Sequence, residues 1–164
     1  MSTKRRSYEA GHSPKFLVVI DDSPECDRAV YFASRRAMRT GTGVVMLRVI
    51  ETRDHSQQWL GVADIMRAEA HEEANAILNR HAARASSITG VMPERVIREG
   101  DKAEELLKLI DENEDISALI LAAGTGSEGP GPLVSSLIKT AGTFPIPVAI
   151  VPGHLSDEDL DTMS

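Results

Sequence analysis

The chain has 164 residues, of which 41% are hydrophobic and 26% charged, which is enough for one sizeable core and too little for two. Acidic residues outnumber basic ones by 25 to 18, and the net charge of −7 argues against a broad nucleic-acid or anionic-membrane surface. The single cysteine, Cys26, has no intramolecular partner, which fits a reducing compartment. With neither a secretory signal nor an apolar run of about 20 residues, we expect a cytoplasmic protein without nucleic-acid or membrane partners.

The sequence divides into three stretches. Residues 1–14 are polar and are expected to form a flexible N-terminal tail, whereas residues 15–153 carry the pattern of one α/β domain. Residues 154–164 form an acidic C-terminal tail, which either adds a short capped helix from Ser156 or adds no structure.

Five short apolar runs alternate with helical patterns in the domain. The runs are rich in β-branched residues and bounded by Gly, Pro, Asp or Ser, as buried strands of a parallel sheet are. They span residues 16–20, 44–50, 94–98, 116–122 and 147–151, and the third is short and alternating, as an edge strand is. Helices are expected from Ser23 to Gly41, with Ser23 as the cap, and from about 59 to 86, from Asp101 onward, and from about 133 to 142.

Right-handed crossovers between these strands predict a doubly wound, five-stranded parallel sheet in the order 3-2-1-4-5, with helices on both faces. In such sheets ligands bind beyond the carboxyl ends of the strands, where the winding reverses. The first and fourth strands flank that reversal, and the most unusual loops of the sequence follow these two strands. We therefore expect a ligand cleft between strands 1 and 4.

The loop after the fourth strand packs four glycines into residues 124–132, directly before a helix. Glycines let backbone N–H groups approach a ligand closely, and the helix start adds partial positive charge, so this loop suits phosphate oxygens. Ser127, Ser135 and Ser136 would supply hydroxyl donors. The same composition also fits a connector without a ligand, because Gly and Pro are the commonest turn residues, and Glu128 would repel a phosphate unless it points away.

Several other chemistries are excluded by their spacing. The string from Gly124 to Gly129 has the spacing of a dinucleotide fingerprint, but it follows the fourth strand, and no acidic residue ends the next one. Pro130 stands where a Walker A loop needs Lys. The five histidines include no close pair, and Ser127 lacks a nucleophile elbow, so no metal site and no catalytic residue is expected. Any hydrolysis would be slow and incidental.

Four segments resemble the universal stress protein (UspA-like) family in their order along the chain. They are Ile20-Asp21-Asp22-Ser23, Val49-Ile50-Glu51, Leu121-Ala122-Ala123-Gly124-Thr125 and Pro147-Val148-Ala149-Ile150-Val151. The resemblance spans roughly residues 15–153. It implies the 3-2-1-4-5 sheet, a role in the stress response, a homodimer commonly paired through the last strand, and, for some members, binding of ATP.

The resemblance also assigns residues to a nucleotide. Asp21 matches an aspartate near the adenine and Val49 a residue whose backbone contacts the base, although Asp22 competes with Asp21 and either could cap the helix instead. Of the family's phosphate-binding pattern, the opening glycine pair is present, the closing Gly-Ser is absent, and Ser135-Ser136 is its nearest counterpart. The expected nucleotide-binding residues are Ile20, Asp21, Val49, Ala123, Gly124, Gly126, Ser127, Gly129, Ser135 and Ser136.

The leading hypothesis is a dimeric stress-response protein that holds ATP or another adenine nucleotide such as AMP, with or without Mg²⁺. The alternative is a nucleotide-independent dimeric regulator that acts through protein partners. An enzyme of the related nucleotide-handling α/β superfamily would need an acceptor site that the sequence does not reveal. Trp59, within the polar segment 51–65, would either cover the cleft, contact a partner or begin a helix on the core.

Overall fold

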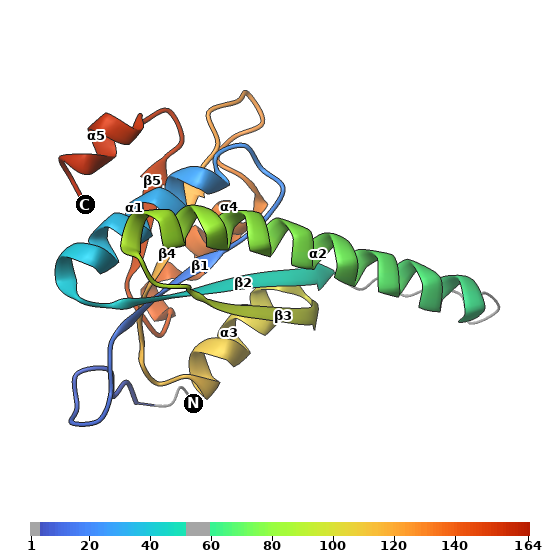
Figure 1. The fold of residues 1–164 in the computed structure, drawn as a ribbon. Helices are drawn as coiled ribbons and strands as arrows, with labels where there is room; N and C mark the ends of the chain where they lie inside the picture. The colour runs from blue at the N-terminus through green and yellow to red at the C-terminus, as the bar shows by residue number, and fades with distance from the viewer. Residues whose placement is uncertain (1–3, 52–59) are drawn as a thin grey trace.

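Five parallel strands form one sheet in the predicted order β3-β2-β1-β4-β5 (Figure 1). The computed structural model describes residues 4–51 and 60–164. The strands are β1 (Lys15–Val19), β2 (Gly43–Glu51), β3 (Glu94–Gly100), β4 (Ile116–Ala123) and β5 (Val148–Pro152). The helices are α1 (Cys26–Thr40), α2 (Leu60–Thr89), α3 (Lys102–Glu112), α4 (Pro132–Thr140) and α5 (Asp157–Asp161), with a 3-10 turn η2 (Ala141–Thr143).

Two apolar cores lie on opposite faces of the sheet. In β1, Val18 packs with residues of α1 and α2, whereas Leu17 and Val19 pack with residues of α3 and α4. Leu17 and Val18 are both fully buried, because helices cover both faces of this central strand. This burial explains why the strands are continuous apolar runs rather than alternating ones, and it identifies the fold as doubly wound α/β.

The segment before β1 lies against the end of α3 and the start of β4. Nη1 of Arg5 donates hydrogen bonds to the carbonyl oxygens of Ile110 (2.6 Å) and Asn113 (3.0 Å), and Nδ1 of His12 lies 2.5 Å from Oδ1 of Asp115. The polar composition of residues 1–14 indicated a loose tail, and it could not indicate these contacts, because their partners lie far along the chain.

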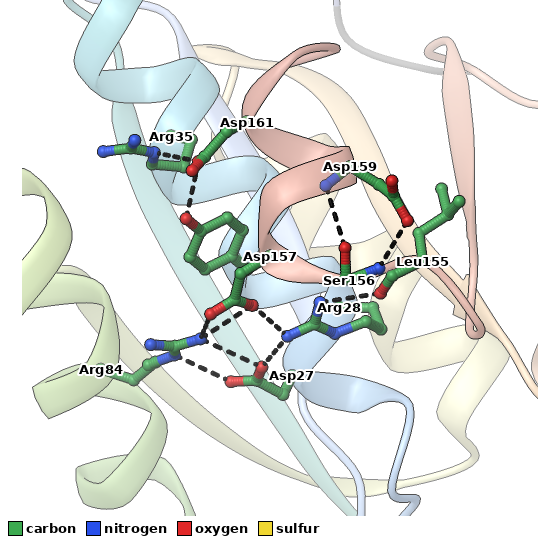
Figure 2. A network of polar contacts seen from close by, with 10 residues as sticks. Asp27, Arg28, Arg35, Arg84, Leu155, Ser156, Asp157, Asp159 and Asp161 are labelled. Atoms are coloured by element: carbon green, nitrogen blue, oxygen red, sulfur yellow. Dashed lines mark hydrogen bonds and ion pairs between the residues drawn. The ribbon is translucent and has the colours of Figure 1, made fainter.

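A charged network holds α5 against α1 and α2 (Figure 2). Arg28 of α1 contacts Asp157 of α5 at 2.5 Å and donates a hydrogen bond to the carbonyl oxygen of Leu155 at 2.9 Å. Arg84 of α2 lies 3.1 Å from both Asp27 and Asp157. The network therefore joins three helices around the first turn of α1.

The C-terminal stretch contains the short capped helix, one of the two alternatives that the sequence left open. Oγ of Ser156 accepts a hydrogen bond from the amide of Asp159 at 3.0 Å, and Oδ2 of Asp159 accepts one from the amide of Ser156 at 3.1 Å, which is a capping box. Leu160 is 1% exposed and belongs to the core beside α1, and the Tyr31 hydroxyl donates to Asp161 at 2.6 Å. Side-chain packing and ion pairs thus fasten α5 to the domain.

Candidate functional site

The loops that follow β1 and β4 meet at the carboxyl edge of the sheet, where the winding reverses. A Cβ placed on Gly124, directly after β4, would lie 3.0 Å from Oε1 of Glu25, which follows β1. Asp21 and residues 130–134 line one small crevice together. The two segments that the sequence predicted to be neighbours are therefore in contact.

Asp21 shapes the turn between β1 and α1. Its Oδ1 accepts hydrogen bonds from the amide of Ser23 at 2.9 Å and from the hydroxyl of Ser23 at 2.5 Å. The expected capping of α1 by Ser23 is wrong, because the Asp21 turn holds Ser23 and the helix begins only at Cys26, with Glu25 in the capping position. Asp21 remains half-buried at the edge of the sheet.

A hollow of about 410 Å³, which we call the wide hollow, opens beyond the ends of β1 and β2. Its volume falls in the range of roughly 300–1,000 Å³ that is usual for small-molecule sites. Asp21 and Val49, the two residues expected near an adenine, both line it, and Val49 is only 4% exposed. The lining residues are Asp21, Asp22, Ser23, Arg48, Val49, Ile50, Glu51, Ala70, Glu73 and Lys102.

Two cationic residues of the wide hollow were missed from the sequence. Arg48 donates a hydrogen bond of 3.4 Å to the carbonyl oxygen of Ile20 and one of 3.3 Å to Oδ2 of Asp22, and its buried Nε has no hydrogen-bond partner among the described residues. Lys102, the first residue of α3, lies 3.8 Å from Glu51 in a loose ion pair. The signal for Arg48 was a charged residue inside an otherwise apolar strand, whereas no local pattern marked Lys102.

A second, narrower space of about 80 Å³ lies between the ends of β1 and β4, and we call it the narrow crevice. Its lining residues are Val19, Asp21, Ser23, Glu25, Cys26, Ala29, Lys102, Leu121, Ala122, Pro130, Gly131, Pro132, Leu133 and Val134. Asp21, Ser23 and Lys102 line both spaces. Cys26 is 3% exposed, and burial raises the pKa of its thiol to about 12, so the thiol is protonated at neutral pH.

The glycine-rich loop folds partly onto itself. The amide of Gly124 donates to the carbonyl oxygen of Pro130 at 3.0 Å, and the amide of Gly129 donates to that of Gly126 at 3.2 Å. Positive φ angles of 93° at Gly129 and 110° at Gly131 make these tight turns possible. The amides of Gly129, expected at the phosphates, and of Gly124, expected at the ribose, are thus already hydrogen-bonded within the loop.

The expected nucleotide-binding residues fall into two groups. Asp21 and Val49 line the wide hollow, and Ile20 is buried beside them at the end of β1. The others line neither the wide hollow nor the narrow crevice, and Ser135 and Ser136 are exposed on α4. This second group consists of Ala123, Gly124, Gly126, Ser127, Gly129, Ser135 and Ser136. The residues expected at the base therefore lie together at the wide hollow, whereas those expected at the ribose and the phosphates line neither space.

Two further features concern ions and membranes. Within residues 4–51 and 60–164, no three His, Cys, Asp or Glu side chains are grouped so that they could hold a metal ion. In the same ranges, no helix is long and apolar enough to cross a bilayer. Trp59, considered as a cover for the cleft, lies outside the described residues.

Solved structures of similar fold include nucleotide complexes. UspA from Lactobacillus plantarum has a TM-score of 0.71 and 17% identity, over 84% of this chain and 97% of that one. The universal stress protein from Archaeoglobus fulgidus in complex with dAMP has a TM-score of 0.60 and 16% identity, over 84% and 96%. A universal stress protein family protein from Arabidopsis thaliana with AMP bound has a TM-score of 0.58 and 20% identity, over 88% and 94%.

The sequence also matches a family model. No curated protein matches the chain significantly. The model of the universal stress protein family, however, matches residues 13–152, which is most of the 164-residue chain and includes all five strands. The match agrees with the strand order and with the ordered segments that suggested the family. This chain belongs to the universal stress protein family.

Proposed function

We propose that this protein binds an adenine nucleotide in the wide hollow, as a stress-response protein. The observation that carries the proposal is that Asp21 and Val49 line one hollow of about 410 Å³. Two similar folds, from Archaeoglobus fulgidus and Arabidopsis thaliana, are described with dAMP and AMP bound. A space of this size accommodates a nucleoside with some of its phosphate.

Asp21 supplies the polar group that recognises the base. Its Oδ1 is occupied by Ser23, whereas its Oδ2 makes no hydrogen bond to the described residues. A carboxylate oxygen accepts hydrogen bonds only, so Oδ2 suits the exocyclic amine of adenine and disfavours the carbonyl that guanine carries at the same position. The buried Val49 supplies an apolar wall beside it. Adenine is therefore favoured over guanine.

The test is calorimetric titration of the purified protein with adenosine, AMP, ADP, ATP and GMP, after analysis of any small molecule released by denaturation. We expect adenine ligands to bind and Asp21→Asn to weaken them about tenfold, because the amide can turn its donor toward the base. Asp115→Asn is the matched control, since Asp115 precedes β4 at the opposite end of the sheet. Dissociation constants no tighter than millimolar for every adenine ligand would overturn the proposal.

A second function, as a dimeric regulator that acts through protein partners without a nucleotide, is favoured by the edge of the sheet. β5 pairs with β4 alone, and Ile150 on this strand is 40% exposed. An exposed apolar edge strand offers unpaired backbone groups to a second copy. If the chain dimerises through β5, Ile150→Lys should convert a dimer into a monomer in light-scattering measurements, while exposed Ile65→Lys on α2 should not. A protein monomeric at every concentration would exclude this second function in its dimeric form.

A further inference from the structure

The side chain of Glu25 lines the narrow crevice and has no hydrogen-bond or ion-pair partner among the described residues. It is half-buried, sits at the capping position of α1 and makes no capping hydrogen bond. Among residues 4–51 and 60–164, no Lys, Arg or His forms an ion pair with it. A half-buried carboxylate with neither a capping hydrogen bond nor an ion pair among the described residues is a candidate for a role toward a ligand.

Glu25 lies between the wide hollow and the glycine-rich loop, where the phosphates of a bound nucleotide would extend. The wide hollow and the narrow crevice share the lining residues Asp21, Ser23 and Lys102, so the two spaces are adjacent, and one end of a ligand in the wide hollow would lie next to the crevice. On the far side, Oε1 of Glu25 would lie 3.0 Å from a Cβ on Gly124. The carboxylate therefore faces the first residue of the loop that a phosphate chain would have to reach.

The space beyond Lys102 is small. The narrow crevice measures about 80 Å³, against about 410 Å³ for the wide hollow, so a phosphate chain finds far less room there. A triphosphate would have to displace the Glu25 side chain or the loop itself. The Glu25 side chain also starts close to the segment after β5, because a Cβ added to Gly153 would lie 3.2 Å from Cβ of Glu25.

Charges and donors along the crevice also favour one phosphate. Lys102, which lines both spaces, offers a cation to the first phosphate, and its ion pair with Glu51 is long at 3.8 Å. Beyond it, Glu25 repels further negative charge. Of the five crevice-lining residues before and within the first turn of α4, Pro130 and Pro132 have no backbone N–H, which leaves donors at Gly131, Leu133 and Val134.

We propose that Glu25 selects for a single phosphate, so that the protein binds a nucleoside monophosphate in preference to the triphosphate. This proposal rests on the proposed function, because it assumes that the base occupies the wide hollow. Lys102 attracts the first phosphate, and the Glu25 carboxylate excludes the second and third.

Titrations of the whole protein with adenosine, AMP and ATP, without Mg²⁺, test the selection. The wild type should bind AMP more tightly than ATP by about tenfold or more. Glu25→Gln should narrow this ratio about tenfold by raising the affinity for ATP, while the affinity for adenosine stays unchanged. Glu114→Gln, at the other end of the sheet before β4, is the matched control and should leave the ratio unchanged. Added salt should narrow the ratio in the wild type more than in Glu25→Gln, because salt screens repulsion.

A second variant tests the attraction. Lys102→Met should weaken the binding of AMP and leave the binding of adenosine unchanged. The Lys108 side chain is 62% exposed on the same helix, and Lys108→Met should change neither affinity. Thermal unfolding of each variant verifies that it is folded. Wild-type protein that binds ATP as tightly as AMP, or a ratio unchanged by Glu25→Gln, would overturn the selection and leave nucleotide binding intact. If neither wild type nor Glu25→Gln binds any of the three ligands, the selection and the proposed function both fail.

Discussion

The two sides of the first turn of α1 differ in how their charges are used. On the outer side, Asp27 and Arg28 are paired with Arg84 and Asp157 in one network (Figure 2). On the inner side, the Glu25 carboxylate faces the glycine-rich loop and, within the described residues, has no such partner. The charges on the outer side stabilise the fold through ion pairs, whereas the charge on the inner side is available to a ligand.

The largest effect is expected from Gly153→Ala, which tests how tightly the inner side is packed. A Cβ at this position would lie 2.4 Å from the carbonyl oxygen of Ala123, a backbone atom that cannot turn away. Overpacking of this kind costs about 1–3 kcal/mol, and we expect the upper part of that range in the free energy of unfolding measured with urea.

Gly126→Ala is the matched control for that substitution. A Cβ on Gly126 meets its nearest neighbour, the amide nitrogen of Glu128, only at 4.0 Å. Its unfolding free energy should change by no more than about 0.5 kcal/mol. Equal losses in the two variants would mean that the inner side is not closely packed at Gly153.

The next largest effect is expected from Arg28→Ala on the outer side. Arg28 bridges Asp27, Asp157 and the carbonyl oxygen of Leu155, and its side chain is 15% exposed. Its loss should cost about 1–2 kcal/mol in unfolding free energy, limited because Arg84 remains with both carboxylates. Arg36→Ala, at an exposed position of the same helix, should cost less than about 0.5 kcal/mol. A loss no larger than that of Arg36→Ala would show that the network adds nothing to stability.

A smaller change in the free energy of unfolding is expected when the pH is lowered. The hydrogen bond from Arg28 holds the pKa of Asp157 below its ordinary value. Burial alone would raise the pKa of Asp27, but hydrogen bonds from Arg84 and Arg28 outweigh it, so this pKa is lowered as well. Groups with lowered pKa values stabilise the fold fully above their unfolded pKa of about 3.9, and this contribution is lost as the pH falls through the folded values.

Asp157→Asn measures that contribution. Because Asp157 is 46% exposed, solvent screens its pairs, and the variant should lose under about 1 kcal/mol at pH ~7. The difference from the wild type should shrink toward zero as urea unfolding is repeated down to pH ~3. A difference that does not decline at all as the pH falls below ~3.9 would point to packing rather than charge as the source of the loss.

The fold was predictable because its signals are local or follow from general rules of topology. Continuous apolar runs such as 16–20 mark strands covered on both faces, and right-handed crossovers leave few possible orders. The closeness of the turn after β1 to the loop after β4 followed from the same rules, because carboxyl ends of neighbouring parallel strands lie at one edge. Family membership, suggested by four short segments in order, was confirmed by the match over residues 13–152.

The details of the site were less predictable because they depend on hydrogen bonds between particular atoms. Asp21 accepts a hydrogen bond from the amide of Ser23, and α1 begins only at Cys26, with Glu25 close to Gly124. The same local sequence could equally have capped a helix at Ser23. Glycine density indicated that the loop could approach a phosphate, but it could not indicate that amides bond within the loop. The position of Lys102 at both spaces could be known only from the place of the start of α3 in the fold.

The smallest effect is expected from Glu25→Gln on stability, and its smallness sharpens the contrast between the two sides of the turn. Two opposing contributions meet at this carboxylate. Its place at the start of α1 gains about 0.3–1 kcal/mol from the partial positive charge of the helix end. Its half-buried position, without a cation among the described residues, costs a comparable amount in lost hydration.

Because these contributions nearly cancel, the unfolding free energy of Glu25→Gln should stay within about 0.5 kcal/mol of the wild type, while Arg28→Ala is clearly destabilised. Urea unfolding of both variants beside the wild type measures this difference. A loss above about 1 kcal/mol for Glu25→Gln would reveal that the carboxylate has a structural role. A neutral result means instead that this carboxylate can be exchanged without loss to the fold, so that an altered ratio of AMP to ATP affinity in Glu25→Gln reports on the ligand alone.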